Sequence, residues 1–227
     1  MKHSVTQWHS SLTEQCALER RCPRSRSSLC IVENTHNFHG GRVVPIEALA
    51  AVREALPDTI RLHLDGARLW NAHVASGTPL HDFAATADTV MVCLSKGIGC
   101  PAGSMVIGDK EAVLEARRLR KVLGGGMRQV GVLAAPALVA LGEGFDHIAE
   151  DHRRAKRLAE AFGVDPESVN SNIVIVPVED APAVAARLDA EGVRVVDISP
   201  TEIRLVTHRD VGDEEVERAV RAAKLLR

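Results

Sequence analysis

Three polar residues follow short apolar segments that have the pattern of parallel strands. His36 comes shortly after the first of these segments, Asp65 lies near the end of the segment 60–67, and Lys96 follows the nearly all-apolar segment 89–94. In open α/β sheets, ligands bind at the carboxyl ends of the strands. Because lysine is rarely buried without a partner, a lysine where an apolar strand breaks into a glycine-rich turn indicates a chemical role.

Two arginines accompany the lysine and the carboxylate. Arg68 follows Asp65 by about one helical turn, and Arg204 stands inside an apolar, strand-like segment where a charge needs a partner. Enzymes that use pyridoxal phosphate hold it as a Schiff base on a lysine and pair an aspartate with the pyridinium nitrogen. Arginines bind a substrate carboxylate through paired hydrogen bonds. The combination of these four residues therefore favours pyridoxal phosphate chemistry on an amino acid.

Each residue also has an ordinary structural interpretation. Lys96 could extend from a strand end into water, and Asp65 could serve only the turn before Gly66. Arg204 could be an edge-strand charge or half of an ion pair. Three histidines and a carboxylate near the same strand ends offer a metal hydrolase as a further alternative: His36, His39, His63 and Asp65. Their spacing matches no established metal site, so we predict that no metal is bound.

The composition excludes several other classes of protein. The 227 residues include 28 basic and 30 acidic side chains, and the net charge of -2 gives no electrostatic argument for nucleic acid or an anionic membrane. No apolar run approaches the ~20 residues that a membrane-spanning helix needs. Five cysteines without CxxC pairs indicate neither a disulfide framework nor a zinc site. We therefore expect a cytoplasmic protein that acts on a small molecule, without nucleic-acid or membrane partners.

Strands and helices alternate along most of the chain. Strands are expected at 29–34, 60–67, 89–94, 102–108, 172–178, 193–197 and 202–206. Helices are expected from Pro45, from an N-cap at Asp109 to the glycines 124–126, and at 131–142, 146–162, 181–191 and 213–226. The segment 89–94 reads as a strand buried on both faces. This alternation predicts an α/β sheet followed by a smaller α+β unit.

The chain divides into three predicted parts. Residues 1–28 mix Ser, Arg, Gln, His and Cys without a helical or alternating period, and we expect a disordered extension there. Residues 29–145 are predicted to form a partial cofactor-binding large domain. Residues 146–227 are predicted to form a small C-terminal domain.

Five segments together resemble the low-specificity L-threonine aldolases. They occur in order from about Leu29 to the C-terminus: ENTHNFHGG (33–41), HLDGARLWNA (63–72), CLSKGIGCPAGSMVIGD (93–109), GGGMRQVGVLAAPALVAL (124–141) and IRLVTH (203–208). That family belongs to the fold-type-I pyridoxal phosphate enzymes, in the broad group of the β-eliminating lyases. The resemblance implies a fold-type-I transferase-like large domain, here incomplete, and a small α+β domain.

The resemblance also implies roles for individual residues. Lys96 is expected to hold the cofactor covalently, Asp65 to pair with its ring nitrogen, and Arg68 and Arg204 to bind the substrate carboxylate. Arg128 is expected to contact the cofactor or a neighbouring subunit. The implied reaction is cleavage of a β-hydroxy amino acid, L-threonine or L-allo-threonine, to glycine and acetaldehyde by homotetramers. We place His36 at the substrate, and both His36 and His39 stay open as the base.

One part of the family pattern is not matched. In the family, a substantial region precedes the ENTH motif and supplies a helix N-terminus that holds the cofactor phosphate. Residues 1–28 do not resemble that region, so we expect an N-terminally truncated member. The alternatives are a start further upstream, or an impaired chain that acts only in assembly with a full-length homologue or not at all.

Overall fold

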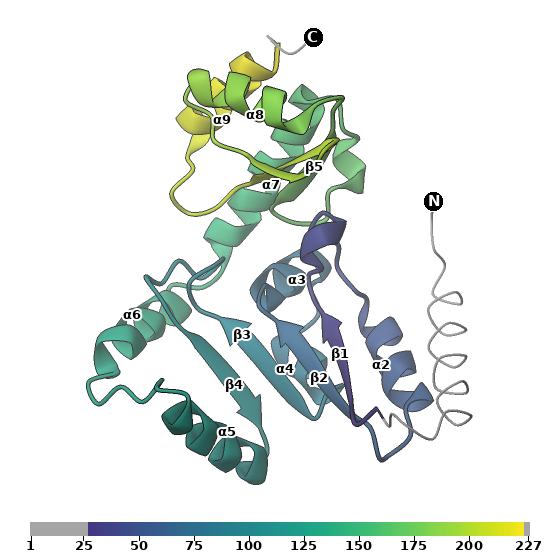
Figure 1. Cartoon of the computed structure of the whole chain (residues 1–227), viewed down its shortest axis with the longest axis vertical. Helices are drawn as coiled ribbons and strands as arrows, with labels where there is room; N and C mark the ends of the chain where they lie inside the picture. Colours follow the sequence, from purple (N-terminus) through teal and green to yellow (C-terminus); the bar gives the residue numbers. More distant parts are fainter. Residues whose placement is uncertain (1–26, 225–227) are drawn as a thin grey trace.

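The computed structural model describes residues 27–224, which form two sheet-containing units joined by a long helix (Figure 1). The disordered extension predicted for residues 1–28 therefore lies outside the described residues except at its last two positions. Within residues 27–224, no single helix is long and apolar enough to cross a membrane. The pair α6 (Gly131–Gly142) and α7 (Asp146–Ala161) passes the same test by length and composition, with a bend of 78° between the two helices.

The first sheet has four strands in the order β1-β2-β3-β4. Their bounds are Leu29–Glu33 for β1, Arg61–Gly66 for β2, Thr89–Cys93 for β3 and Ser104–Gly108 for β4. The first three strands are parallel, and β4 runs antiparallel to β3. Glu33 pairs in register with Asp65, and Asp65 with Met91. Because β1, β2 and β3 run the same way, the polar residues that end or follow them meet at one edge of the sheet.

Three helices cover one face of this sheet: α2 (Ile46–Ala55), α3 (Leu69–Ser76) and α4 (Leu80–Ala85). Pro45 precedes α2 as predicted, but neither α3 nor α4 was predicted from the sequence. The first four residues of α3, Leu69–Ala72, are all buried, so this helix has no polar face to produce a helical period. In α4, six residues are too few to show one.

The prediction that the segment 89–94 is buried on both faces is wrong for one face. Val90 and Val92 are buried in the core, whereas Thr89, Met91 and Cys93 are half-buried. The buried side chains point toward the helices that cover the sheet, and the others point to the opposite face. Because the segment is nearly all apolar, its sequence did not show that one face of the strand is less buried than the other.

Two helices, α5 (Lys110–Val122) and α6 (Gly131–Gly142), follow β4. The predicted N-cap is confirmed, since Asp109 Oδ1 accepts a hydrogen bond from the Ala112 amide at 2.8 Å. In Figure 1 both helices lie beside β4, on the side of the sheet away from β1 and α2.

The second unit is a three-stranded antiparallel sheet with the order β5-β7-β6, packed against helices. The strands are β5 (Ile173–Pro177), β6 (Val196–Ser199) and β7 (Glu202–Val206), and the helices are α7 (Asp146–Ala161), α8 (Ala181–Ala190) and α9 (Asp213–Ala223). The strand predicted at 193–197 begins later, because the Val193 amide bonds to the Leu188 carbonyl and closes the end of α8. Val193 and Val195 still pack on the core, which explains their apolar character.

Helix α7 spans both units (Figure 1). Ile148, in its first turn, belongs to the core of the first unit, whereas Ala155 and Leu158 belong to the core of the second. The boundary predicted at residue 146 falls at the start of this helix. A direct contact also joins the units, because the Ser171 hydroxyl donates to the Gly41 carbonyl at 2.7 Å. The division into domains at this boundary stays a prediction.

Candidate functional site

Asp65 and Lys96 are placed by the carboxyl ends of two adjacent strands. One carboxylate oxygen of Asp65 accepts from the Ala67 amide at 3.0 Å, which fixes the direction of this side chain. Lys96 follows β3 by a short turn, and its side chain is exposed. The end of β3 is held in place by Trp70, whose indole nitrogen donates to the Cys93 carbonyl at 2.9 Å.

Arg68 lies among several charged groups at the same edge. Burial is the main cause that lowers the pKa of its guanidinium, and nearby Glu33 opposes this effect. The positive charge of Arg204 lowers the pKa further, and Asp65 raises it slightly. Two guanidinium groups therefore lie near one another beside a half-buried edge, which favours an anion that can neutralise both.

Arg204 comes from β7, in the second unit. Its Nη1 donates to the Oδ1 of Asn37 at 2.9 Å. Its Nε is buried and has no hydrogen-bond partner among residues 27–224. A buried donor without a partner costs about 1–3 kcal/mol, so this atom favours a bound acceptor at the site.

His36 begins the turn that follows β1. Its Nδ1 lies 2.9 Å from the Nδ1 of His39, and its Nε2 lies 3.9 Å from a carboxylate oxygen of Glu33. Burial is the largest effect on the His36 pKa and lowers it, while Glu33 raises it and His39 lowers it. The neutral imidazole is therefore the favoured form at neutral pH, and a neutral imidazole can accept a proton.

The turn itself is closed by hydrogen bonds. The His36 amide donates to the Arg42 carbonyl, and the Gly41 amide donates back to the His36 carbonyl, both at 2.9 Å. The side chain of Asn34 bonds to both the amide and the carbonyl of Val44, at 3.1 and 3.0 Å. These contacts hold His36 beside Glu33, at the edge that Asp65 and Lys96 share.

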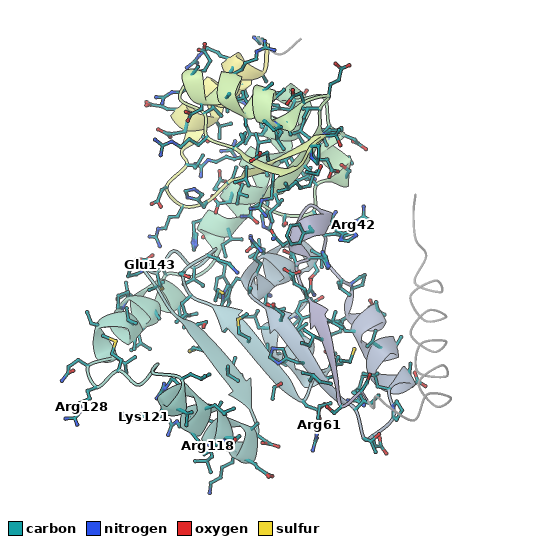
Figure 2. All side chains as sticks on the ribbon, in the orientation of Figure 1. Arg42, Arg61, Arg118, Lys121, Arg128 and Glu143 are labelled. Atoms are coloured by element: carbon teal, nitrogen blue, oxygen red, sulfur yellow. The ribbon has the colours of Figure 1, made fainter. Side chains whose placement is uncertain are left out.

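Two of the residues considered from the sequence lie apart from this group. Arg128 is exposed in the segment between α5 and α6, at the outer rim of the molecule (Figure 2). His63 bonds through Nδ1 to the Thr89 hydroxyl at 2.8 Å, within the sheet. Over the range 27–224, no three His, Cys, Asp or Glu side chains are grouped so that they could hold a metal ion. The geometry therefore gives no support to the metal hydrolase alternative.

Three further residues shape the site and were given no role from the sequence. Glu33 faces both Arg68 and His36, Asn37 binds Arg204, and Trp70 holds the strand before Lys96. Glu33 and Asn37 both belong to the ENTHN motif. The position of Glu33 at the end of a strand, like that of Asp65, is the signal that could have identified it.

The parallel strands, the lysine after β3 and the second small sheet define the fold of the fold-type-I pyridoxal phosphate enzymes. A threonine aldolase from Leishmania major superimposes with a TM-score of 0.73 at 22% identity, over 99% of this chain and 67% of that one. This likeness confirms the predicted fold class.

The sequence then assigns the family. The profile described as "Beta-eliminating lyase" matches residues 11–181, and the chain belongs to that family. The low-specificity L-threonine aldolase 1 of Arabidopsis thaliana is 40% identical over 200 residues, covering 83% of this chain and 56% of that protein. The low specificity L-threonine aldolase of Escherichia coli (strain K12) is 39% identical over 198 residues, covering 85% and 58%. The predicted resemblance is confirmed, and the chain spans somewhat more than half the length of these relatives.

Proposed function

We propose that this chain takes part in the pyridoxal phosphate-dependent cleavage of L-threonine or L-allo-threonine to glycine and acetaldehyde. The observation that supports the proposal is that Asp65 and Lys96 lie at or just after the carboxyl ends of two adjacent parallel strands, with the Arg68 guanidinium close enough to Asp65 and Arg204 to feel their charges. The buried Nε of Arg204, which has no partner among the described residues, fits the carboxylate of an amino acid. The names of the relatives from Arabidopsis thaliana and Escherichia coli agree with this substrate class.

The residues present fit the cofactor. Lys96 offers an exposed amine for covalent attachment, and the Asp65 carboxylate, whose direction the Ala67 amide fixes, would pair with the ring nitrogen. Pyridoxal phosphate, when bound, supplies a ring that accepts the electron pair released at the substrate Cα. An ionised aspartate keeps that ring nitrogen protonated, and this raises the ability of the ring to take up electrons.

Other residues of this protein bind the substrate and transfer its protons. Arg68 and Arg204 bind the substrate carboxylate and thereby orient the bond that breaks. His36, whose burial favours the neutral form, accepts the proton of the β-hydroxyl group as the Cα–Cβ bond breaks and acetaldehyde leaves. Cα then takes up one proton, and glycine is released.

The test uses the whole chain with added pyridoxal phosphate. Borohydride reduction followed by peptide mass spectrometry is expected to locate the cofactor on Lys96, and Lys96→Ala is expected to abolish both attachment and glycine formation. Lys110→Ala, at an exposed lysine of α5, is the matched control. A wild-type chain that neither attaches the cofactor nor forms glycine from either substrate overturns the proposal for the chain alone. Activity regained on adding a longer homologue then favours the partner-dependent alternative.

A conservative change tests the binding of the carboxylate. Arg68→Lys keeps the positive charge but removes the planar pair of donors that suits a carboxylate. We expect KM for L-threonine to rise by about tenfold, the effect of losing about 1.4 kcal/mol. An unchanged KM contradicts the role proposed for this arginine.

We also propose that the chain assembles into a homo-oligomer, a tetramer as in the family, and that Arg128 contacts the cofactor or a neighbouring subunit. The exposed position of Arg128 and the apolar side chains exposed on α6 support a subunit contact there. A cytoplasmic location is supported by two described cysteines that are free thiols, Cys93 and Cys100.

A further inference from the structure

The turn that carries Lys96 is tightly built. The Gly99 amide donates to the Lys96 carbonyl at 2.8 Å, and the Cys100 amide donates to the Leu94 carbonyl at 3.0 Å. Ile98 is fully buried, although the Lys96 side chain is exposed. The direction of the Lys96 side chain therefore depends on how the peptide groups immediately after it are held.

His147 holds one of these peptide groups from the other side. Its Nε2 lies 2.7 Å from the Gly97 carbonyl oxygen. A carbonyl oxygen only accepts hydrogen bonds, so Nε2 carries the proton and donates. His147 is the second residue of α7, the helix that continues into the core of the second unit. The hydrogen bond thus connects the lysine turn to that helix.

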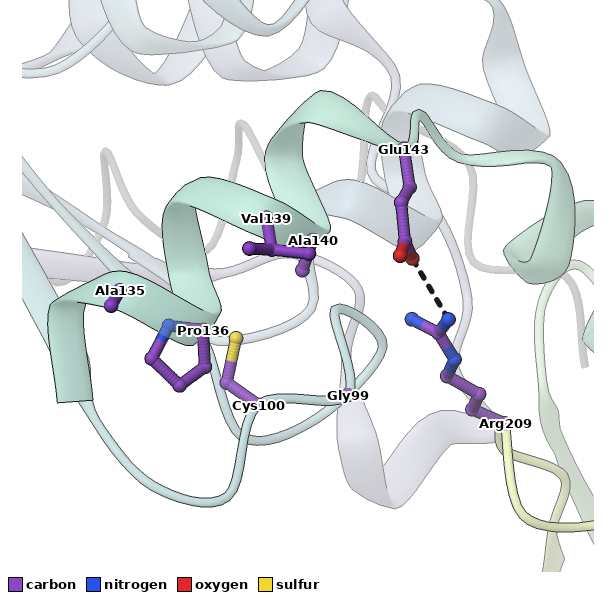
Figure 3. A pocket seen from close by; sticks show the side chains of 8 residues that line it. All are labelled: Gly99, Cys100, Ala135, Pro136, Val139, Ala140, Glu143 and Arg209. Atoms are coloured by element: carbon purple, nitrogen blue, oxygen red, sulfur yellow. Dashed lines mark hydrogen bonds and ion pairs between the residues drawn. The ribbon is translucent and has the colours of Figure 1, made fainter. Parts of the chain in front are cut away.

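Two neighbours enclose the same turn. A Cβ atom at Gly97 would lie 2.8 Å from Oδ1 of Asn71, in α3. A Cβ atom at Gly99, whose φ is +81°, would lie 3.0 Å from Cδ of Arg209, and Arg209 in turn binds Glu143 at 2.8 Å (Figure 3). Glycine is therefore needed at 97 for space, and at 99 for both space and the left-handed conformation.

We propose that His147 is a positioning residue for Lys96, acting through its hydrogen bond to the Gly97 carbonyl. The bond fixes the peptide group between Gly97 and Ile98, the second after the lysine, while Asn71 and Arg209 prevent the turn from moving toward α3 or toward the loop after β7. The orientation of the lysine amine at the sheet edge is thereby coupled to α7. This inference rests on the proposed function, because it assumes that Lys96 is the attachment point of the cofactor.

Two amide variants isolate the hydrogen bond. Glutamine places a donor near the position of the histidine Nε2, whereas asparagine places its donor near that of Nδ1 and does not reach the Gly97 carbonyl. The variants His147→Gln and His147→Asn therefore differ mainly in how far the amide donor reaches. His208→Gln is the control, because His208 is exposed to 50% and lies after β7.

The first readout needs no cofactor. Amide hydrogen exchange of the segment 96–100 is expected to be about tenfold faster in His147→Asn, while His147→Gln stays close to wild type. The second readout is the pKa observed when the visible absorbance of the lysine-bound cofactor is titrated. This pKa is expected to shift in the asparagine variant only. A purely structural role of His147 would not produce such a shift.

The outcomes separate this inference from the proposed function. Equal exchange rates and equal titrations in the wild type and both variants overturn the role of His147. Equally faster exchange and equally shifted pKa values in both variants also overturn it, because the position of the donor then has no effect. If the wild type takes up no cofactor, the proposed function fails, and the exchange comparison still decides whether His147 holds the turn.

Discussion

Arg204 donates a hydrogen bond from Nη1 to Oδ1 of Asn37 across 2.9 Å, and this contact joins the second sheet to the turn after β1. It orients one of the two arginines that we assign to the substrate carboxylate. The Asn37 contact fixes the position of this arginine before any anion binds, and its buried Nε has no partner among residues 27–224. Such preorganisation reduces the cost of ordering the side chain when the substrate arrives.

Removing the partner of Arg204 is expected to weaken substrate binding more than catalysis. Asn37→Ala leaves Nη1 without its acceptor, and we expect KM for L-threonine to rise by about tenfold with little change in kcat. Steady-state kinetics measure the effect. Asn170→Ala, at an exposed asparagine, is the control. A loss confined to kcat would show that Asn37 acts in another way.

Asp88 is expected to stabilise the first sheet in a pH-dependent manner. Its carboxylate accepts from the Leu62 amide at 2.7 Å and binds Arg53 and Arg61, and the Leu62 hydrogen bond is the main cause that lowers its pKa from 3.8. We expect Asp88→Ala to reduce the free energy of unfolding by about 2 kcal/mol at neutral pH.

The sign of the pH effect follows from the lowered pKa of Asp88. The stabilisation is present above the unfolded value of 3.8 and is lost as the pH falls through the lower, folded value. The free energy of unfolding, measured with urea, should therefore differ less between the wild type and Asp88→Ala below about pH 4. Asp58→Ala, at an exposed carboxylate, should show no such difference.

The sequence predicts those parts of the fold that local patterns determine. Strand β7 has the predicted bounds, and Asp109 caps its helix, because alternation and capping depend on neighbouring residues. The helix α3 could not be found in this way. Its first turn is buried on every side, so packing rather than a periodic pattern determines its conformation.

The site was predictable only in part. Strand ends identify Asp65 and Lys96, since parallel strands bring such positions to one edge whatever the details of packing. The hydrogen bond between Arg204 and Asn37 joins residues 167 positions apart, and the one between His147 and Gly97 spans 50. Contacts of this kind arise from the tertiary fold, and no spacing in a single sequence reveals them.

His152 is expected to make the protein less stable in mild acid. Burial, together with the smaller effect of the Lys156 charge, lowers its pKa from 6.5 to about 4. Between these values the unfolded chain binds a proton that the folded chain does not, so stability falls as the pH drops from about 6.5 to about 4. We expect the free energy of unfolding, measured with urea, to fall by an amount on the order of 2 kcal/mol between about pH 7 and about pH 4.5.

The variant His152→Gln tests this origin of the acid sensitivity. Glutamine does not titrate, and it can still accept the hydrogen bond that Asn71 makes to His152 at 3.1 Å. The loss of stability between the two pH values should therefore become smaller in this variant. His81→Gln, at a histidine exposed to 83%, should keep the wild-type dependence. An unchanged dependence in His152→Gln would mean that another group binds the proton.

The apolar surface of α6 is expected to determine the oligomeric state. Val132 and Leu138 are 63% and 73% exposed in the single chain, and Leu123, shortly before this helix, is 83% exposed. Water-exposed apolar side chains that gather on neighbouring elements mark a protein contact more often than an isolated apolar side chain does.

We expect Leu138→Lys to lower the molar mass found by light scattering after size exclusion, because a buried lysine without a partner opposes association. Val196→Lys, at an exposed valine of β6, is the matched control and should leave the mass unchanged. If Leu138→Lys has the wild-type mass, this surface does not form the subunit contact.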